Sequence, residues 1–115
     1  MNKLLPKALE ADGIVLGAPV HYASAAGQAS CAYDRLFVMS NGAFANKLGA
    51  AVVSCRRGGA SATFDQLNKY FTISNMPVVS GTYWNQVHGN TPDEVKQDWK
   101  ECRTCAPSGG IWLGC

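Results

Sequence analysis

The sequence IVLGAPVHY at residues 14–22 decides the fold. It begins as an apolar run typical of a buried strand, and Pro19 then fixes the backbone as it leaves the sheet. The sequence VVSCRRGG at residues 52–59 has the same form, because an apolar run stops at a polar, glycine-containing loop. Open α/β sheets bind ligands in the crevice beyond the carboxyl ends of their strands. We call these stretches the first and second junction. Together they predict a small-molecule site, with a flat cofactor as the expected ligand.

Outward from the junctions, helical and strand patterns alternate. The patterns predict helices over residues 2–11, 25–39 and 60–72 and strands over residues 13–18, 48–54 and 77–82. Asn41 and Gly42 end the second helix, and Thr91, Pro92 and Glu94 form the start signal of a last one. This order implies a parallel sheet with right-handed crossovers. The apolar run of the second strand further predicts a sheet covered on both faces.

Length and composition restrict the classes of function. The 115 residues have room for one domain, and 47% apolar and 16% charged residues are typical of a globular protein. No apolar run approaches the roughly 18–20 residues of a membrane span, and the N-terminus does not form a secretory signal. We therefore expect a cytoplasmic protein with no membrane partner. The net charge is only +2, with both signs mixed, so we expect no nucleic-acid partner.

Longer motifs around the junctions resemble a known family. Residues 11–22 (ADGIVLGAPVHY), followed by GQ at 27–28 and DRLF at 34–37, resemble the NADPH-dependent FMN reductase and iron–sulfur flavoprotein branch of the flavodoxin-like superfamily. Residues 54–59 and 81–89 are similar to the second and third flavin loops of that family. The resemblance covers residues 4–98. It implies a flavodoxin-like three-layer α/β/α fold with a parallel sheet, of which about three strands are present.

The resemblance also implies a function. Family members transfer hydride from NADPH to FMN, pass electrons to a small-molecule acceptor such as a quinone or a free flavin, and commonly form homo-oligomers. The predicted cofactor-binding residues are Pro19, Val20, His21, Tyr22, Ala23, Ser54, Arg56, Gly58 and Gly59. The glycines permit close approach of the backbone to the flavin, and Arg56 or Arg57 would stabilise a reduced, anionic ring. The alternative for each junction is an ordinary turn with solvated side chains. No side chain is assigned as catalytic, because the flavin carries the redox chemistry.

Two features depart from the family pattern. Residues 1–115 contain no GSPR-type loop, which in the family holds the FMN phosphate at a helix N-terminus, and Ser30 or Cys31 stands where the family usually has Lys. We therefore expect an unpaired edge on the first strand and weak or lost FMN binding. Either the chain is N-terminally truncated, or a partner strand covers this edge. In the third flavin loop, the resemblance implies that Trp84, Asn85 and His88 reach the flavin of a neighbouring subunit. The alternative is a surface aromatic loop. The alternative function is a non-catalytic, truncated fold with a structural or oligomerising role.

Three of the five cysteines lie in the C-terminal residues 99–115. Residues 1–98 are predicted to form the partial flavodoxin-like domain, and residues 99–115, which have no period, an irregular tail. One hypothesis is a metal site of Cys102, Cys105 and Cys115, with or without His88. Structural zinc usually takes two well-spaced ligand pairs, so no metal is predicted. The other is a translational frameshift from residue 104, with a helix encoded one base late. Cys31 and Cys55 are predicted to be small, reduced core residues.

Overall fold

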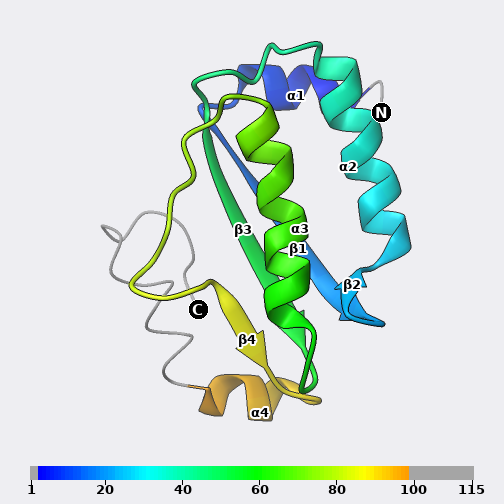
Figure 1. Cartoon of the computed structure of the whole chain (residues 1–115), viewed down its shortest axis with the longest axis vertical. Coiled ribbons are helices and arrows are strands. Elements are labelled where there is room, and N and C mark those ends of the chain that lie inside the picture. Colours follow the sequence, from blue (N-terminus) through cyan, green and yellow to red (C-terminus); the bar gives the residue numbers. More distant parts are fainter. Residues whose placement is uncertain (1–2, 99–115) are drawn as a thin grey trace.

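A four-stranded sheet in the order β2-β1-β3-β4 organises the chain (Figure 1). The structure is a computed structural model that describes residues 3–98. The strands are β1 (Gly13–His21), β2 (Ser24–Ala25), β3 (Leu48–Cys55) and β4 (Gln86–His88). The helices are α1 (Leu4–Glu10), α2 (Gly27–Ser40), α3 (Ala60–Ile73) and α4 (Pro92–Gln97). The predicted tail and its metal and frameshift hypotheses lie outside the described residues.

Parallel pairing brings the two junctions side by side. β1 pairs with β3 from Gly13↔Leu48 to Pro19↔Ser54, and β3 pairs with β4 as far as Cys55↔His88. β2 is antiparallel to β1. The carboxyl ends of β1, β3 and β4 therefore lie at one end of the sheet (Figure 1). This arrangement confirms the predicted α/β class with a mostly parallel sheet.

Local signals set the helix boundaries as predicted. Helix α2 ends at Asn41, which takes the left-handed conformation with φ 48° and is followed by Gly42 with φ 83°. At the start of α4, the Thr91 hydroxyl accepts a hydrogen bond from the Glu94 N–H at 3.3 Å. This bond satisfies one of the N–H groups that a helix start leaves free.

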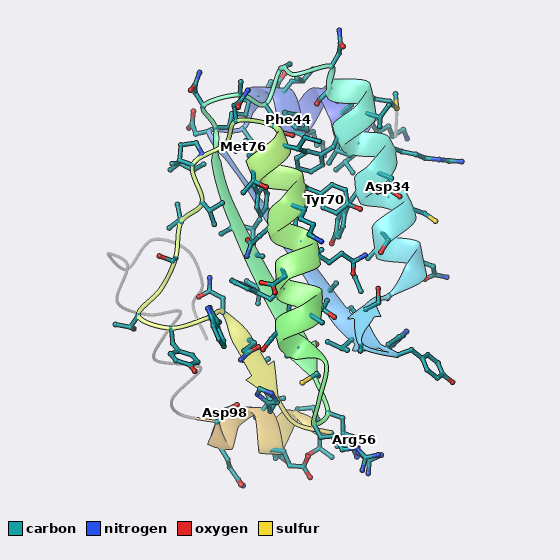
Figure 2. All side chains as sticks on the ribbon, viewed as in Figure 1. Asp34, Phe44, Arg56, Tyr70, Met76 and Asp98 are labelled. Carbon is teal, nitrogen blue, oxygen red and sulfur yellow. The ribbon has the colours of Figure 1, made fainter. Side chains whose placement is uncertain are left out.

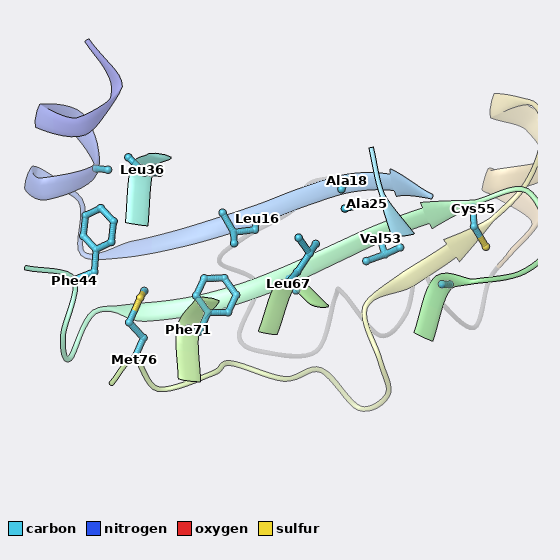
Figure 3. Close-up of a cluster of buried hydrophobic side chains, with 13 residues drawn as sticks. Leu16, Ala18, Ala25, Leu36, Phe44, Val53, Cys55, Leu67, Phe71 and Met76 are labelled. Carbon is cyan, nitrogen blue, oxygen red and sulfur yellow. The ribbon is translucent and has the colours of Figure 1, made fainter. Parts of the chain in front are cut away.

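The core lies between the sheet and helices α2 and α3 (Figure 3). Leu16 and Val53 point from the strands toward Leu67 and Phe71 of α3, and all four side chains are at most 2% exposed. Full burial of one such side chain contributes about 1.5–3 kcal/mol. Gly49 of β3 makes the packing possible, because a Cβ there would lie 2.6 Å from the Phe71 ring. The core therefore fixes α3 directly on the central strands.

A polar contact joins the two long helices. The Tyr70 hydroxyl of α3 donates a hydrogen bond to the Asp34 carboxylate of α2, and the two side chains face each other in Figure 2. Burial, together with Asp34, raises the pKa of Tyr70 to about 12. The phenol therefore stays protonated, and remains a donor to Asp34, throughout the neutral range.

The opposite face of the sheet is exposed within the described residues. Val15 of β1 and Leu48 of β3 alternate with the core residues and are 46% and 43% exposed. The expectation that the strand at 48–54 would be covered on both faces is wrong for this part of the chain. Its physical reason is the placement of α2 and α3, which both pack on the other face (Figure 1).

The outer edge of β1 is largely unpaired in residues 3–98. The Asp12 carbonyl accepts from the Leu48 N–H, so the alternation of a strand turns the polar groups of Gly13, Val15 and Gly17 toward the other edge. Of these groups, the Gly17 carbonyl accepts a hydrogen bond from the Tyr33 hydroxyl of α2. On that edge, β2 pairs only with Val20 and His21. No described strand pairs with this edge over residues 13–18, so the unpaired strand edge predicted for the first strand is present.

Four local predictions are wrong. The strand predicted over 13–18 continues to His21, because β2 returns alongside it as a hairpin. The strand predicted over 77–82 is only an isolated bridge at Val78, and the third parallel strand is β4, in a segment predicted as a loop. Pro77 has no N–H to donate, and beyond Val79 the chain leaves the sheet until residue 86. Cys31 is exposed on α2, whereas Cys55 is buried as predicted.

Candidate functional site

The turn between β1 and β2 has an unusual backbone. His21 and Ser24 pair across two residues, Tyr22 and Ala23, whose φ angles are 53° and 58°. Two consecutive positive φ angles are the geometry of a type I′ hairpin turn, which Asn-Gly usually occupies. A non-glycine residue in this conformation costs about 1–2 kcal/mol. The turn is therefore strained, and neighbouring contacts must hold it.

Gly59 brings the second junction against this turn. It is the N-cap residue of α3 and has φ 85°, a conformation that glycine adopts without strain. A Cβ at this position would lie 2.7 Å from the Ala23 Cα and 3.0 Å from a methyl carbon of Val20. The absence of a side chain thus lets the two loops touch. The two predicted junctions form one contiguous site at the carboxyl end of the sheet.

A side chain from α3 supports the same turn. The Gln66 Oε1 accepts hydrogen bonds from the Ser24 hydroxyl at 2.9 Å and from the Ala25 N–H at 3.1 Å. Ala25 is only 5% exposed, so this N–H has little access to water. Sequence reasoning did not find Gln66. Its only signal was a polar residue on the inner side of an otherwise amphipathic helix.

Cys55 is packed inside the second junction. Burial raises the pKa of its thiol and outweighs the backbone N–H groups of Ala60 and Arg57, which lower it. His88 lies opposite Cys55 in the sheet, and its Nδ1 is 3.6 Å from the Asp98 carboxylate. The protonated, buried thiol indicates a packing residue rather than a nucleophile.

All nine predicted cofactor-binding residues lie at this end of the sheet. Pro19 is the register partner of Ser54, and both are exposed. His21 and Arg56 are exposed, and Arg56 points away from the sheet in Figure 2. Tyr22 is fully exposed, and a Cβ on Gly58 would meet no atom within 4 Å. The site therefore offers the accessible ring of Tyr22, the exposed side chains of His21 and Arg56, and open space beside the backbone of Gly58.

Two further properties concern residues 3–98 alone. The longest helices, α2 and α3, have 14 residues each, and no described helix has the length and apolar character needed to cross a membrane. In the same residues, no three His, Cys, Asp or Glu side chains are grouped to hold a metal ion.

The sequence profile of the NADPH-dependent FMN reductase family matches residues 1–91, which include both junctions. The chain belongs to this family. An iron–sulfur flavoprotein of Methanocaldococcus jannaschii is 33% identical over 106 residues, which are 85% of this chain and 55% of that protein. An iron–sulfur flavoprotein of Methanosarcina thermophila is 32% identical over 101 residues, 79% of this chain and 53% of that protein. This FMN reductase-family chain thus spans about half the length of the curated relatives it matches.

Solved structures show the same fold. A flavodoxin, WrbA-like protein from Agrobacterium tumefaciens superposes with a TM-score of 0.73 at 13% identity, over 91% of this chain and 71% of that one. A flavodoxin from the domain Archaea gives a TM-score of 0.61 at 20% identity, over 86% of this chain and 66% of that one. Both comparisons place this member of the FMN reductase family in the flavodoxin-like fold, as predicted.

Proposed function

We propose that this chain forms the ring-binding side of an FMN site in an NAD(P)H-dependent oxidoreductase. The observation that carries the proposal is the contact of the two junctions at Gly59, where a Cβ would lie 2.7 Å from Ala23. This contact joins the β1–β2 turn and the β3–α3 loop into one surface beyond the carboxyl ends of parallel strands, where open α/β sheets bind ligands. Membership in the FMN reductase family supports a flavin as that ligand.

The residues present fit a flat aromatic ring. Tyr22 exposes its whole side chain for stacking, and the open space at Gly58 would let a ring edge approach the backbone closely. Arg56 supplies an exposed positive charge that would stabilise an anionic reduced ring. When bound, FMN would supply the hydride-accepting chemistry, and the chain would supply position and electrostatics.

The partners follow from the family and stay proposals. We propose NADPH as the electron donor, a small-molecule acceptor such as a quinone or free flavin, a homo-oligomeric assembly and a cytoplasmic location. We also propose that FMN binds weakly to this chain, because residues 1–115 contain no phosphate loop of the GSPR type. In that case the ring, and not the phosphate, would provide the affinity.

Riboflavin, which lacks the phosphate, tests this division of the site. In a fluorescence titration of the full chain, we expect FMN and riboflavin to bind with similar affinity, because the proposed site contacts the ring and not the phosphate. The two dissociation constants should differ by no more than about threefold, which is under 1 kcal/mol. Tight FMN quenching at about 1 μM with much weaker riboflavin binding would show a phosphate site and refute the weak-binding proposal. Absence of quenching by either flavin would refute the ring site itself.

A second candidate function is a non-catalytic fold that acts in assembly. The exposed apolar side chains Val15 and Leu48, on a sheet face that residues 3–98 leave uncovered, favour it. Flavin titration combined with sedimentation separates the candidates. A chain that self-associates and binds no flavin would support the assembly role, whereas flavin binding by a monomer would contradict it.

A further inference from the structure

We propose that Gln66 is a positioning residue that holds the β1–β2 turn in the shape presented to the flavin. The inference rests on the proposed flavin site and adds to it a residue outside both junctions. Gln66 lies in the middle of α3, 42 residues from Ser24 in the sequence. Within residues 3–98, its two hydrogen bonds are the only side-chain hydrogen bonds between α3 and the β1–β2 hairpin.

The hairpin geometry explains why the Ala25 N–H needs this partner. The neighbouring Ala26 N–H donates to the Pro19 carbonyl, so the alternation of an antiparallel pair turns the Ala25 N–H away from β1 and toward α3. Ala25 is 5% exposed, and water therefore cannot easily replace the Gln66 oxygen. A buried N–H that loses its acceptor is costly, so removal of Gln66 would push the hairpin away from α3.

The turn next to this anchor cannot hold its own shape. Tyr22 and Ala23 both occupy the left-handed region, which neither residue type favours. Such a conformation persists only where the surroundings determine it. Two contacts do so: Gly59 packs against Ala23 from the second junction, and Gln66 binds Ser24 and Ala25 just beyond the turn. Gln66 thus helps to fix the backbone of the turn that carries Tyr22.

Only the acceptor oxygen of Gln66 takes part in this contact. A backbone N–H can only donate, so the Oε1 atom, and not the Nε2 atom, must face Ala25. A glutamate at this position keeps an acceptor for both donors, and a leucine of similar size keeps none. Gln66→Glu and Gln66→Leu therefore separate the hydrogen-bonding role from simple packing. Asn68→Leu on the same helix is the matched control, since the Asn68 Oδ1 has no hydrogen-bond partner.

The experiment measures both the turn and the flavin in the full chain. In the flavin-free chain, we expect Gln66→Leu to speed amide hydrogen exchange at Ala25 about tenfold relative to exchange at Leu67, which reports opening of the core. We expect the same variant to raise the dissociation constant of FMN at least fivefold, which corresponds to binding weaker by about 1 kcal/mol. Gln66→Glu and Asn68→Leu should stay within about twofold of the parent chain in both measurements.

The outcomes distinguish this inference from the proposed function. If the parent chain binds FMN and Gln66→Leu binds it equally well, the positioning role is wrong and the flavin site stands. If Gln66→Glu behaves like Gln66→Leu, the acceptor role is wrong. If no variant binds flavin but Ala25 exchange rises in Gln66→Leu and is restored in Gln66→Glu, the proposed function fails while the anchoring of the turn is supported. Unchanged Ala25 exchange in Gln66→Leu overturns the inference.

Discussion

Both junctions contain residues in the left-handed backbone conformation, but the residue types differ. In the second, Gly59 adopts φ 85° without strain, and its missing side chain makes room for Ala23. In the first, Tyr22 and Ala23 adopt φ 53° and 58° against their own preference. The second junction therefore holds its shape through residue type, and the first through contacts from elsewhere in the fold. A strained turn maintained in this way is more often found at a functional site than in an ordinary connection.

Gly59→Ala should break the contact between the junctions and have the largest effect. The new Cβ would lie 2.7 Å from the Ala23 Cα, and alanine would also be strained at φ 85°. We expect the free energy of unfolding to fall by about 2–4 kcal/mol in urea denaturation, with a loss of flavin affinity. Gly58→Ala is the matched control, because its Cβ meets no atom within 4 Å, and it should stay within about 0.5 kcal/mol of the parent. Equal effects of the two substitutions would contradict the described contact.

Replacing the strained residues of the first junction with a favoured pair should stabilise the protein instead of destabilising it. The double variant Tyr22→Asn/Ala23→Gly gives the first junction the pair that type I′ turns prefer. We expect the free energy of unfolding to rise by about 1–2 kcal/mol in thermal or urea denaturation, while flavin affinity falls through loss of the Tyr22 ring. Ala62→Gly, at an exposed position of α3, should instead destabilise by about 1 kcal/mol. A double variant that is no more stable than the parent would show that the turn is not strained.

The thiol of the second junction gives a pH-dependent test. Because burial raises the pKa of Cys55 above its unfolded value, the thiol contributes stability that is complete below the unfolded pKa and is lost as pH rises through the folded pKa. Stability should therefore decline above about pH 9 less steeply in Cys55→Ala than in the parent chain, as measured by urea denaturation at a series of pH values.

Alkylation tests the burial of the same thiol. In the native chain at pH 8, iodoacetamide should modify the exposed Cys31 before the buried Cys55, as measured by peptide mapping. Equal modification of both would contradict a closed junction.

Arg56 should have the smallest effect on stability. Its side chain is exposed, so Arg56→Ser should change the free energy of unfolding by less than about 0.5 kcal/mol. If Arg56 faces the reduced ring, the variant should bind oxidised flavin normally but lower the midpoint potential of the bound flavin. An unchanged potential would remove Arg56 from the proposed site while leaving the contact of the junctions intact.

The sequence predicted the parts of the fold that rest on local signals. The strands at both junctions, the end of α2 at Asn41 and the start of α4 at Thr91 all depend on neighbouring residues, and all are present. The segment 77–82 has a strand-like composition, yet it forms only one bridge to β3, between Val78 and Gly49. Further along β3, the parallel partner is β4. Register and competition between segments are tertiary properties that composition does not record.

The sequence likewise predicted where the candidate site lies, but not the contacts that shape it. The nine residues proposed from the junctions do lie at one end of the sheet, because parallel strands end together. The hairpin at Tyr22 and Ala23 was not predicted, since neither residue signals a turn with positive φ. Gln66 was missed for a related reason: a glutamine in a helix looks solvated until its partner, 41 residues away, is placed beside it.

The contact between Gly59 and Ala23 also affects how the free-energy effects of substitutions in the two loops combine. Residues in direct contact do not contribute independently, so the effects of changes in the two loops should deviate from a simple sum. A variant that is silent in one loop can become harmful, or helpful, once the other loop has changed. Efforts to alter the specificity of this protein should therefore vary both loops together, because libraries that randomise each loop alone would sample only half of a coupled surface.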